Sequence, residues 1–488
     1  MNPISSLSNW QPAVRLPSAA ASRAAVYDTP TAAPSSIVKL SPESLAAARQ
    51  ADTEQAVLPA AARFKEVGAA MLRQLSTGAP VPATQAALPD NLDNKFTLDI
   101  VTRSGVKVDL TLASQDDGML YQISADAELS DSERTALARL ADGFQAAIDG
   151  MAAADPQIRI GALAQFDSKA LQAVDFHADV KQPAGTQSLD FHADGKQRKV
   201  SIGGPAGNAD VSVDTSKLAS LGTKEQQTKA IGNYLKQFDQ AAERGHGDKK
   251  LMAMFKDAFS DMNRTAVREE ERSTGLTLPA QWPLADEDHA ALTGLADFSA
   301  SITQAPKWNN PLRSAEKESF SYAVSQATSI DGPRVDDRTV TQTQQAHLTA
   351  QFHTAVKKGG DVKLDVTPQS QTYEYHQIDD AADSNVELGY KDGHLFKARL
   401  SQTASRSERI QTYLMGKLQS DKTIPGQHAL VRDLLASLSP YHGGDQHHAD
   451  DTHEVREGRR QQALSALQER MLLLADPDEL GGRDRGMV

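Results

Sequence analysis

The stretch that decides the fold runs from Val340 to His353 and reads Val-Thr-Gln-Thr-Gln-Gln-Ala-His-Leu-Thr-Ala-Gln-Phe-His. Its apolar residues fall on even positions, whereas its odd positions carry only Thr, Gln and His. Alternation with a period of two places the two sets on opposite faces of a β-strand. The stretch therefore predicts a long antiparallel strand with one face toward a core and the other toward solvent.

The same alternation recurs on both sides of this stretch. Lys391-Asp-Gly-His394 is typical of a hairpin turn, because Asp-Gly readily adopts the positive φ angles that tight turns need. We expect residues 296–403 to form an antiparallel β module. The other alternating apolar sets are Phe320/Tyr322/Val324, Val362/Leu364/Val366 and Phe396/Ala398/Leu400.

A second β-rich region precedes it, at residues 95–215. Two apolar runs, Phe96–Thr102 and Val106–Ala113, flank Arg103-Ser-Gly105, which is a hairpin signal. Further along, Ser130-Asp-Ser-Glu133 forms a capping box that opens a helix. The region therefore combines antiparallel strands with one or two helices.

These patterns predict an α+β fold with two polar antiparallel β-sheet modules and helical segments between and after them. Thr223-x-x-Gln226 is a further capping box, which predicts a helix start within residues 216–295. Within residues 404–440 we expect two short helices, at about 405–419 and 427–438. The expected order is a disordered leader (1–40), a helix (41–76), a linker (77–94), the first β module (95–215), a helical segment (216–295), the second β module (296–403), a helical segment (404–440), a polar His-rich tract (441–453) and an amphipathic helix (454–476).

Composition excludes several classes of function. The chain has 488 residues, a formal net charge of −13 and no cysteine. An acidic chain without a basic stripe is not expected to bind nucleic acid. No apolar run approaches the length of a membrane span, and no apolar segment follows Met1 as in a cleaved signal peptide. Without cysteine there are no disulfides, thiolate metal sites or cysteine nucleophiles.

The leader, residues 1–40, is rich in Ser, Ala and Pro and contains one acidic residue, Asp28. Such a composition does not fold alone. It resembles the uncleaved export signals of type III and flagellar secretion substrates, which implies export without a cleaved signal peptide. A plain disordered terminus of a cytoplasmic protein is the alternative.

An octapeptide occurs twice, at residues 175–182 (Asp-Phe-His-Ala-Asp-Val-Lys-Gln) and 190–197 (Asp-Phe-His-Ala-Asp-Gly-Lys-Gln). We expect a hairpin with its turn at Gly185-Thr186. Its apolar face would point to a core, and its polar face could bind a divalent metal such as Zn²⁺ or form cross-strand ion pairs. The candidate metal ligands are His177, Asp179, His192 and Asp194. The expected cross-strand pairs are Asp175–Lys196, His177–Asp194, Asp179–His192 and Lys181–Asp190.

The His-rich tract offers a second set of candidate metal ligands, namely His447, His448, Asp451 and His453. The run His453-Glu454-Val-Arg-Glu457 lacks the second histidine of the zincin helix motif, so that mechanism is not expected. A polar linker before the last helix is the alternative. We expect no cofactor other than such a divalent metal.

Two glycine-containing runs have structural explanations. Gly203-Gly-Pro-Ala-Gly207 lacks the Lys-Ser/Thr of a phosphate-binding loop and is read as a turn. Arg244-Gly-His-Gly-Asp248 could place a general base at His246, but it more simply ends one helix and caps the next at Asp248. No residue is therefore assigned a catalytic role.

Short runs between residues 96 and 180 carry a family resemblance. They are Ser-Gly-Val-Lys-Val-Asp-Leu-Thr-Leu (104–112), Leu-Ser-Asp-Ser-Glu-Arg-Thr-Ala-Leu (129–137) and Phe-Asp-Ser-Lys-Ala-Leu (166–171) before Val-Asp-Phe (174–176). The segment resembles a group of bacterial proteins of unknown function. The resemblance implies a bacterial origin and a shared β-helix-β module, and it transfers no catalytic residue.

Together these observations predict a non-catalytic bacterial binding or structural protein, exported in a secretion or surface context, that acts through a protein partner. Two alternatives stay open. One is a metal-dependent enzyme or secreted effector that uses the His and Asp clusters, and the other is a cytoplasmic scaffold.

Overall fold

The computed structural model describes residues 60–77, 89, 92–115, 118–216, 220–264, 284, 286–357, 359–435, 438 and 453–485. The predicted leader, the first part of the predicted helix 41–76 and all of the His-rich tract except His453 lie outside these residues. So does most of the predicted linker 77–94. In the described part of the chain, every helix is too short or too polar to cross a bilayer.

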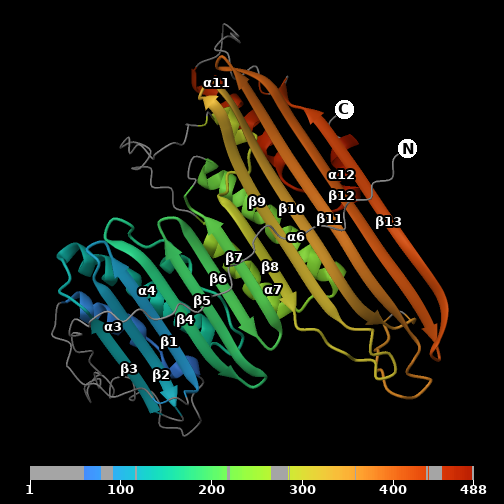
Figure 1. Cartoon of the computed structure of the whole chain (residues 1–488), viewed down its shortest axis with the longest axis horizontal. Helices are drawn as coiled ribbons and strands as arrows, with labels where there is room; N and C mark the ends of the chain where they lie inside the picture. Colours follow the sequence, from blue (N-terminus) through green and yellow to red (C-terminus); the bar gives the residue numbers. More distant parts are fainter. Residues whose placement is uncertain are drawn as a thin grey trace, which may run out of the picture.

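The described strands form one antiparallel sheet of 13 strands, in the order β13-β12-β11-β10-β9-β8-β7-β6-β5-β4-β1-β2-β3 (Figure 1). The strands at the β3 edge are short, and those at the β13 edge are more than twice as long. Their bounds are β1 Asn94–Thr102, β2 Lys107–Gln115, β3 Gly118–Ala125, β4 Leu171–Gln182, β5 Gly185–Asp194, β6 Gln197–Gly204, β7 Gly207–Asp214, β8 Asp297–Gln304, β9 Ser319–Arg334, β10 Asp337–Thr354, β11 Tyr373–Lys391, β12 His394–Leu414 and β13 Lys417–Asp433.

The α+β class is confirmed, with helices between and after the strands, but the prediction of two sheet modules is wrong. Strand β7 pairs with β8 along its whole length, from Gly207 opposite Gln304 to Asp214 opposite Asp297. Two separate sheets would each have left an edge strand with unpaired backbone groups at this point. Pairing β7 with β8 satisfies both edges and makes the sheet continuous.

The prediction of a helical segment at residues 404–440 is also wrong, because most of these residues belong to strands β12 and β13. Within residues 401–414, Arg406, Glu408, Arg409 and Gln411 form helices readily, although the segment also holds five Ser and Thr residues. Here pairing with β11, from Ala381 opposite Ser405 to Tyr373 opposite Tyr413, overrides that preference. The alternating set Val362/Leu364/Val366, predicted as a strand, lies in the loop between β10 and β11.

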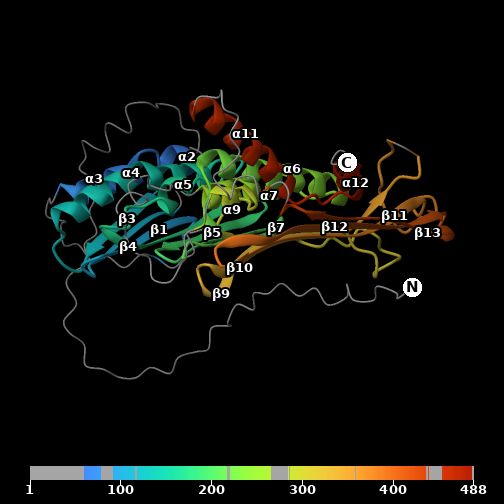
Figure 2. The same ribbon diagram turned by 90° about the horizontal axis from the view of Figure 1, so that it is seen from above.

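The described helices lie on one side of the sheet (Figure 2). We call the side under the helices the covered face and the other side the open face. The even residues of β10 are buried on the covered face, as the alternation predicts. The helices are α2 Ala60–Arg63, α3 Val67–Ser76, α4 Asp131–Ala152, α5 Gly161–Ala164, α6 Lys224–Gly245, α7 Lys249–Asn263, α9 Asp286–Ala290, α11 His453–Met471 and α12 Pro477–Arg485.

Aromatic rings bind the helices to the covered face. Phe144 of α4 meets Phe176 of β4 edge to face, with ring centroids 6.0 Å apart. Tyr234 of α6 and Phe259 of α7 both meet Phe298 of β8, each at 5.1 Å. Each such fully buried ring contributes about 1.5–3 kcal/mol of hydrophobic free energy.

The predicted helix starts are confirmed. Ser130 and Glu133 form a capping box on α4, and Thr223 and Gln226 form one on α6. Asp248 caps α7 by accepting hydrogen bonds from the backbone N–H groups of its first turn. These local signals depend only on residues within one helical turn.

Two glutamines interrupt the apolar face of β10, and the fold gives the reason. Gln344 accepts hydrogen bonds from the Tyr234 hydroxyl (3.0 Å) and the Leu473 N–H (3.1 Å), and it donates one to the Met471 carbonyl (3.0 Å). Gln342 accepts one from the Thr293 N–H (2.9 Å). These two side chains therefore supply hydrogen-bond partners for backbone N–H and C=O groups of segments that pack against the sheet.

Candidate functional site

The duplicated octapeptide forms the hairpin of β4 and β5, but its register differs from the prediction. Asp175 lies opposite His192, and His177 lies opposite Asp190. The turn is therefore at Pro183-Ala184, two residues before Gly185-Thr186, and each residue of β4 pairs with a residue of β5 that is four positions earlier than predicted. An even shift keeps every side chain on its face. The predicted core face is accordingly confirmed, with Phe176, Ala178, Val180, Leu189, Phe191 and Ala193 buried.

Each octapeptide histidine lies between two carboxylates on the open face. His177 places Nδ1 2.6 Å from Asp190 and Nε2 3.0 Å from Asp179. His192 places Nδ1 2.7 Å from Asp175 and Nε2 3.5 Å from Asp194. Burial alone would lower the pKa of His177, but its hydrogen bonds to Asp190 and Asp179 raise that pKa above its ordinary value.

This geometry is that of ion pairs. Both ring nitrogens of each histidine face a carboxylate, so neither offers a free lone pair to a metal. Among the described residues, no group of three or more His, Asp or Glu side chains is arranged to hold a metal ion. His447, His448 and Asp451 lie outside the described residues, and His453 begins α11 with its side chain undescribed. A metal site there stays a prediction.

The two glycine-containing runs connect elements. Gly204 pairs with Gly207 across the β6–β7 hairpin, so the run 203–207 is a turn, as predicted. His246 ends α6 in the left-handed conformation, with φ 54°. Its ring stacks on Phe352 at 3.9 Å between centroids, and burial lowers the pKa of His246.

Beside this helix end lies a partly buried charge cluster that no sequence motif marks. Arg244 makes a bidentate pair with Asp380, and its Nη1 lies 3.2 Å from Glu408. His376 Nδ1 lies 2.8 Å from the other oxygen of Glu408. Burial would raise the pKa of Glu408, but His376 and Arg244 lower it below its ordinary value. The cluster fastens the end of α6 to β11 and β12.

A polar hollow of about 890 Å³ lies where β1 meets the β4–β5 turn. Both signs of charge line it, and Lys181 Nζ lies 3.0 Å from Asp93. Asp179 of the octapeptide is on its wall. Lys181 is already paired, and none of the described residues that line the hollow has the neighbours that would make it a nucleophile or a general base.

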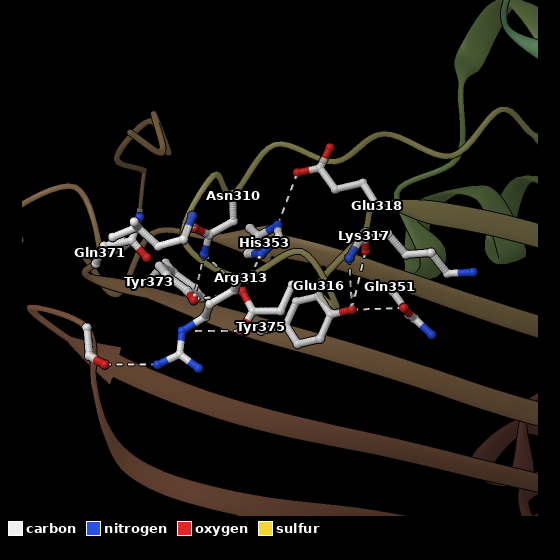
Figure 3. Close-up of polar contacts among 12 residues, drawn as sticks. Asn310, Arg313, Glu316, Lys317, Glu318, Gln351, His353, Gln371, Tyr373 and Tyr375 are labelled. Carbon is white, nitrogen blue, oxygen red and sulfur yellow. Dashed lines mark hydrogen bonds and ion pairs between the residues drawn. The ribbon is translucent and has the colours of Figure 1, made fainter. Parts of the chain in front are cut away.

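A cluster of polar side chains joined by several hydrogen bonds lies on the side of the molecule away from this hollow. We call this part of the molecule the distal end. This end comprises the loop 305–318 between β8 and β9, the loop 355–372 between β10 and β11, and the turn Leu414–Lys417 between β12 and β13 (Figure 1). The loop 305–318 lies on the open face, over residues at the ends of β10 and β11 (Figures 2 and 3).

Glu316 is the centre of this cluster, which we call the loop lock (Figure 3). One of its oxygens accepts a hydrogen bond from the Tyr373 hydroxyl (2.7 Å) and one from Asn310 (3.1 Å), and it lies 3.1 Å from His353 Nε2. The other His353 nitrogen lies 3.4 Å from Glu318. The His353 side chain is 0% exposed and that of Glu316 is 9% exposed.

The charges of the loop lock stabilise one another. Burial would lower the pKa of His353, but its hydrogen bonds to Glu316 and Glu318 raise it above the ordinary value. Burial would raise the pKa of Glu316, but the hydrogen bonds from His353 and Tyr373 lower it. Burial and the bond to Glu316 together raise the pKa of Tyr373. The stable state is therefore an imidazolium beside a carboxylate.

Two more contacts complete the lock. Arg313 donates a hydrogen bond to the Gly416 carbonyl (2.9 Å) and lies 4.1 Å above the Tyr413 ring. The Tyr375 hydroxyl donates to Gln351 (2.8 Å). The His353 side chain is 0% exposed, so a substrate in solvent does not contact this imidazole. The contacts of the loop lock hold the loop 305–318 against the sheet. No motif in the sequence marks it, since its members are as far apart as Asn310 and Tyr413.

Comparisons of the whole chain with protein-family models, with curated proteins and with solved structures found no match. The resemblance seen in residues 96–180 therefore stays a prediction.

Proposed function

We propose that this chain is a non-catalytic bacterial binding protein that is exported and acts through a protein partner. One observation carries the proposal, namely the edge strand β13. A strand at the edge of a sheet presents unpaired backbone N–H and C=O groups, to which an extended segment of another protein can add.

Strand β13 is unusually suited to this mode of binding. It runs from Lys417 to Asp433, and within the described residues no strand flanks its outer side. Typical strands have about 5–6 residues. Most of its residues are exposed, including Ile424 (52%) and Val431 (53%). The opposite edge, β3, has 8 residues, so it offers a much shorter template.

The composition of β13 favours a specific partner over indiscriminate pairing. Pro425 has no N–H, and Lys422 places a charge on the edge; both features blunt edge-to-edge aggregation. Proline fits an edge strand where its N–H would point outward. Because backbone orientation repeats every two residues, the exposed Thr423 also directs its N–H outward.

Site-specific crosslinking tests this proposal. A photo-reactive amino acid at Thr423 in cells of the native bacterium should give one discrete protein adduct. The same amino acid at Thr186, exposed at the start of β5, is the control and should give none. In addition, Thr423→Pro should abolish the adduct formed from a reporter at Ala429, whereas Thr423→Ala should keep it. Equal labelling at both positions, or turnover of a metabolite by the purified protein, would refute the proposal.

The export part of the proposal is supported by the acid-poor leader and the absence of cysteine. Comparison of the full chain with a deletion of residues 2–40 tests it. The full chain should appear in the culture medium and the deletion should stay in the cells. Retention of both would favour the cytoplasmic scaffold instead.

A further inference from the structure

Exposed apolar side chains gather at the distal end. The described residues include ten large apolar side chains that are exposed; six of them lie in the three distal segments, and a seventh, Leu418, directly follows the turn Leu414–Lys417. Scattered single residues would need no explanation, but a concentration at one end does. The seven are Trp308 (61%), Leu312 (56%), Val356 (40%), Val366 (70%), Leu414 (43%), Met415 (58%) and Leu418 (50%).

Met415 is placed there against a backbone cost. It sits in the β12–β13 turn with φ 48°, followed by Gly416 with φ 77°. The β11–β12 turn has the same conformation, and there Asp392 (φ 49°) precedes Gly393. Asp and Asn tolerate this left-handed region, whereas for other residues it costs about 1–2 kcal/mol. A long apolar side chain held in a strained, exposed turn is an outlier that points to function.

The distal end is also basic in an acidic protein. Lys307, Lys357, Lys363 and Lys417 are exposed there, whereas the whole chain has a formal net charge of −13. Two exposed acids, Asp361 and Asp365, lie in the loop 355–372, and Asp365 accepts hydrogen bonds from Thr367. Three other acids nearby face a cation. Asp421 lies 2.6 Å from Arg409, and Glu316 and Glu318 face His353 in the loop lock.

We propose that the distal end docks on the surface of an anionic lipid bilayer. Trp308, Leu312 and Met415 would enter the interfacial region, where aromatic and apolar side chains are favoured. The surrounding lysines would meet the anionic headgroups, with their alkyl stems along the apolar side chains.

The shape of the distal end favours a bilayer over a protein groove. Its apolar residues are carried by three separate segments at the same end of the sheet (Figure 1). A groove in a protein partner typically receives one continuous apolar helix or strand. The interface of a bilayer, in contrast, can accommodate apolar side chains from several separate segments. The loop lock contributes directly, because it holds the loop that carries Trp308 and Leu312.

Vesicle co-sedimentation of the full chain tests this proposal. The protein should pellet with vesicles of phosphatidylcholine containing about 30% phosphatidylserine, should not pellet with phosphatidylcholine alone, and should be released by high salt. Trp308→Ser and Met415→Asn should each weaken binding by about fivefold or more. Met415→Asn should leave the melting temperature equal or higher, since Asn suits the left-handed turn.

Two controls separate the distal end from other surfaces. Phe396→Ser removes a side chain that is 58% exposed at the other end of the long strands, and it should not change vesicle binding. Thr423→Pro, which tests β13, should also leave vesicle binding unchanged. Absence of vesicle binding, or equal binding by Met415→Asn, would overturn the proposal. So would a dimer in sedimentation velocity that the same variants dissociate, because the occupant would then be a second copy of the chain.

Discussion

The loop lock makes a quantitative prediction about Glu316→Gln. This change keeps the shape of the side chain but removes the charge that faces His353, whose side chain is 0% exposed. Breaking a buried ion pair costs about 3–5 kcal/mol. The new amide oxygen can still accept the hydrogen bonds from Tyr373 and Asn310 but lacks the charge that pairs with His353, so we expect a loss of about 2 kcal/mol.

The pH dependence of this loss follows from the two pKa shifts. The pKa of His353 is raised, so its contribution is complete below the ordinary value of 6.5 and is lost as the pH rises through the raised value. The pKa of Glu316 is lowered, so its contribution is complete above the ordinary value of 4.5 and is lost as the pH falls through the lowered value. The effect of Glu316→Gln should therefore be largest between these two ordinary values.

Hydrogen exchange is the appropriate assay, because the lock holds a loop whose opening need not unfold the sheet. Peptides from residues 305–318 should lose protection by about 2 kcal/mol at a pH between those values and by less in alkali. Ser314→Ala, an exposed and uncharged change in the same loop, is the matched control and should have no effect. A loss of protection that is constant from acid to alkali would refute the role assigned to the pair.

Three further predictions concern the rest of the fold. Gln344→Leu should lower the free energy of unfolding, measured in urea, by about 3 kcal/mol, because the Tyr234 hydroxyl, the Leu473 N–H and the Met471 carbonyl lose their hydrogen-bond partner. Thr343→Ala on the open face is the control and should change this free energy by less than about 0.5 kcal/mol. Arg244→Met should cost about 3 kcal/mol, since Asp380 and Glu408 would stay buried without their cation, and a melting temperature equal to wild type would contradict this. In an NMR titration, His177 should show a pKa above that of a free histidine, and Asp190→Asn should lower it, because that carboxylate stabilises the imidazolium.

Local sequence patterns predicted the parts of the fold that depend on near neighbours. The alternation from Val340 to His353 predicted both faces of β10, since side chains in a strand alternate whatever lies beside it. The capping boxes at Ser130 and Thr223 lie within one helical turn, and the Asp392-Gly393 turn needs only its own two residues. The octapeptide hairpin was predicted on the correct face but in the wrong register, because an even shift leaves the facial pattern unchanged.

The features that sequence patterns could not predict depend on residues far apart in the chain. Nothing near Gly207 or Gln304 shows that these residues lie opposite each other and join two sets of strands into one sheet. Short helices were predicted for most of residues 404–433, which instead form strands because β12 pairs with β11 and β13 pairs with β12. The loop lock exists only once the loop 305–318 reaches Tyr373. The sequence by itself determined which residues face a core, because that periodicity is local. Only the tertiary structure decided which strands pair and which charges meet, because those energies arise from contacts that form when distant segments pack together.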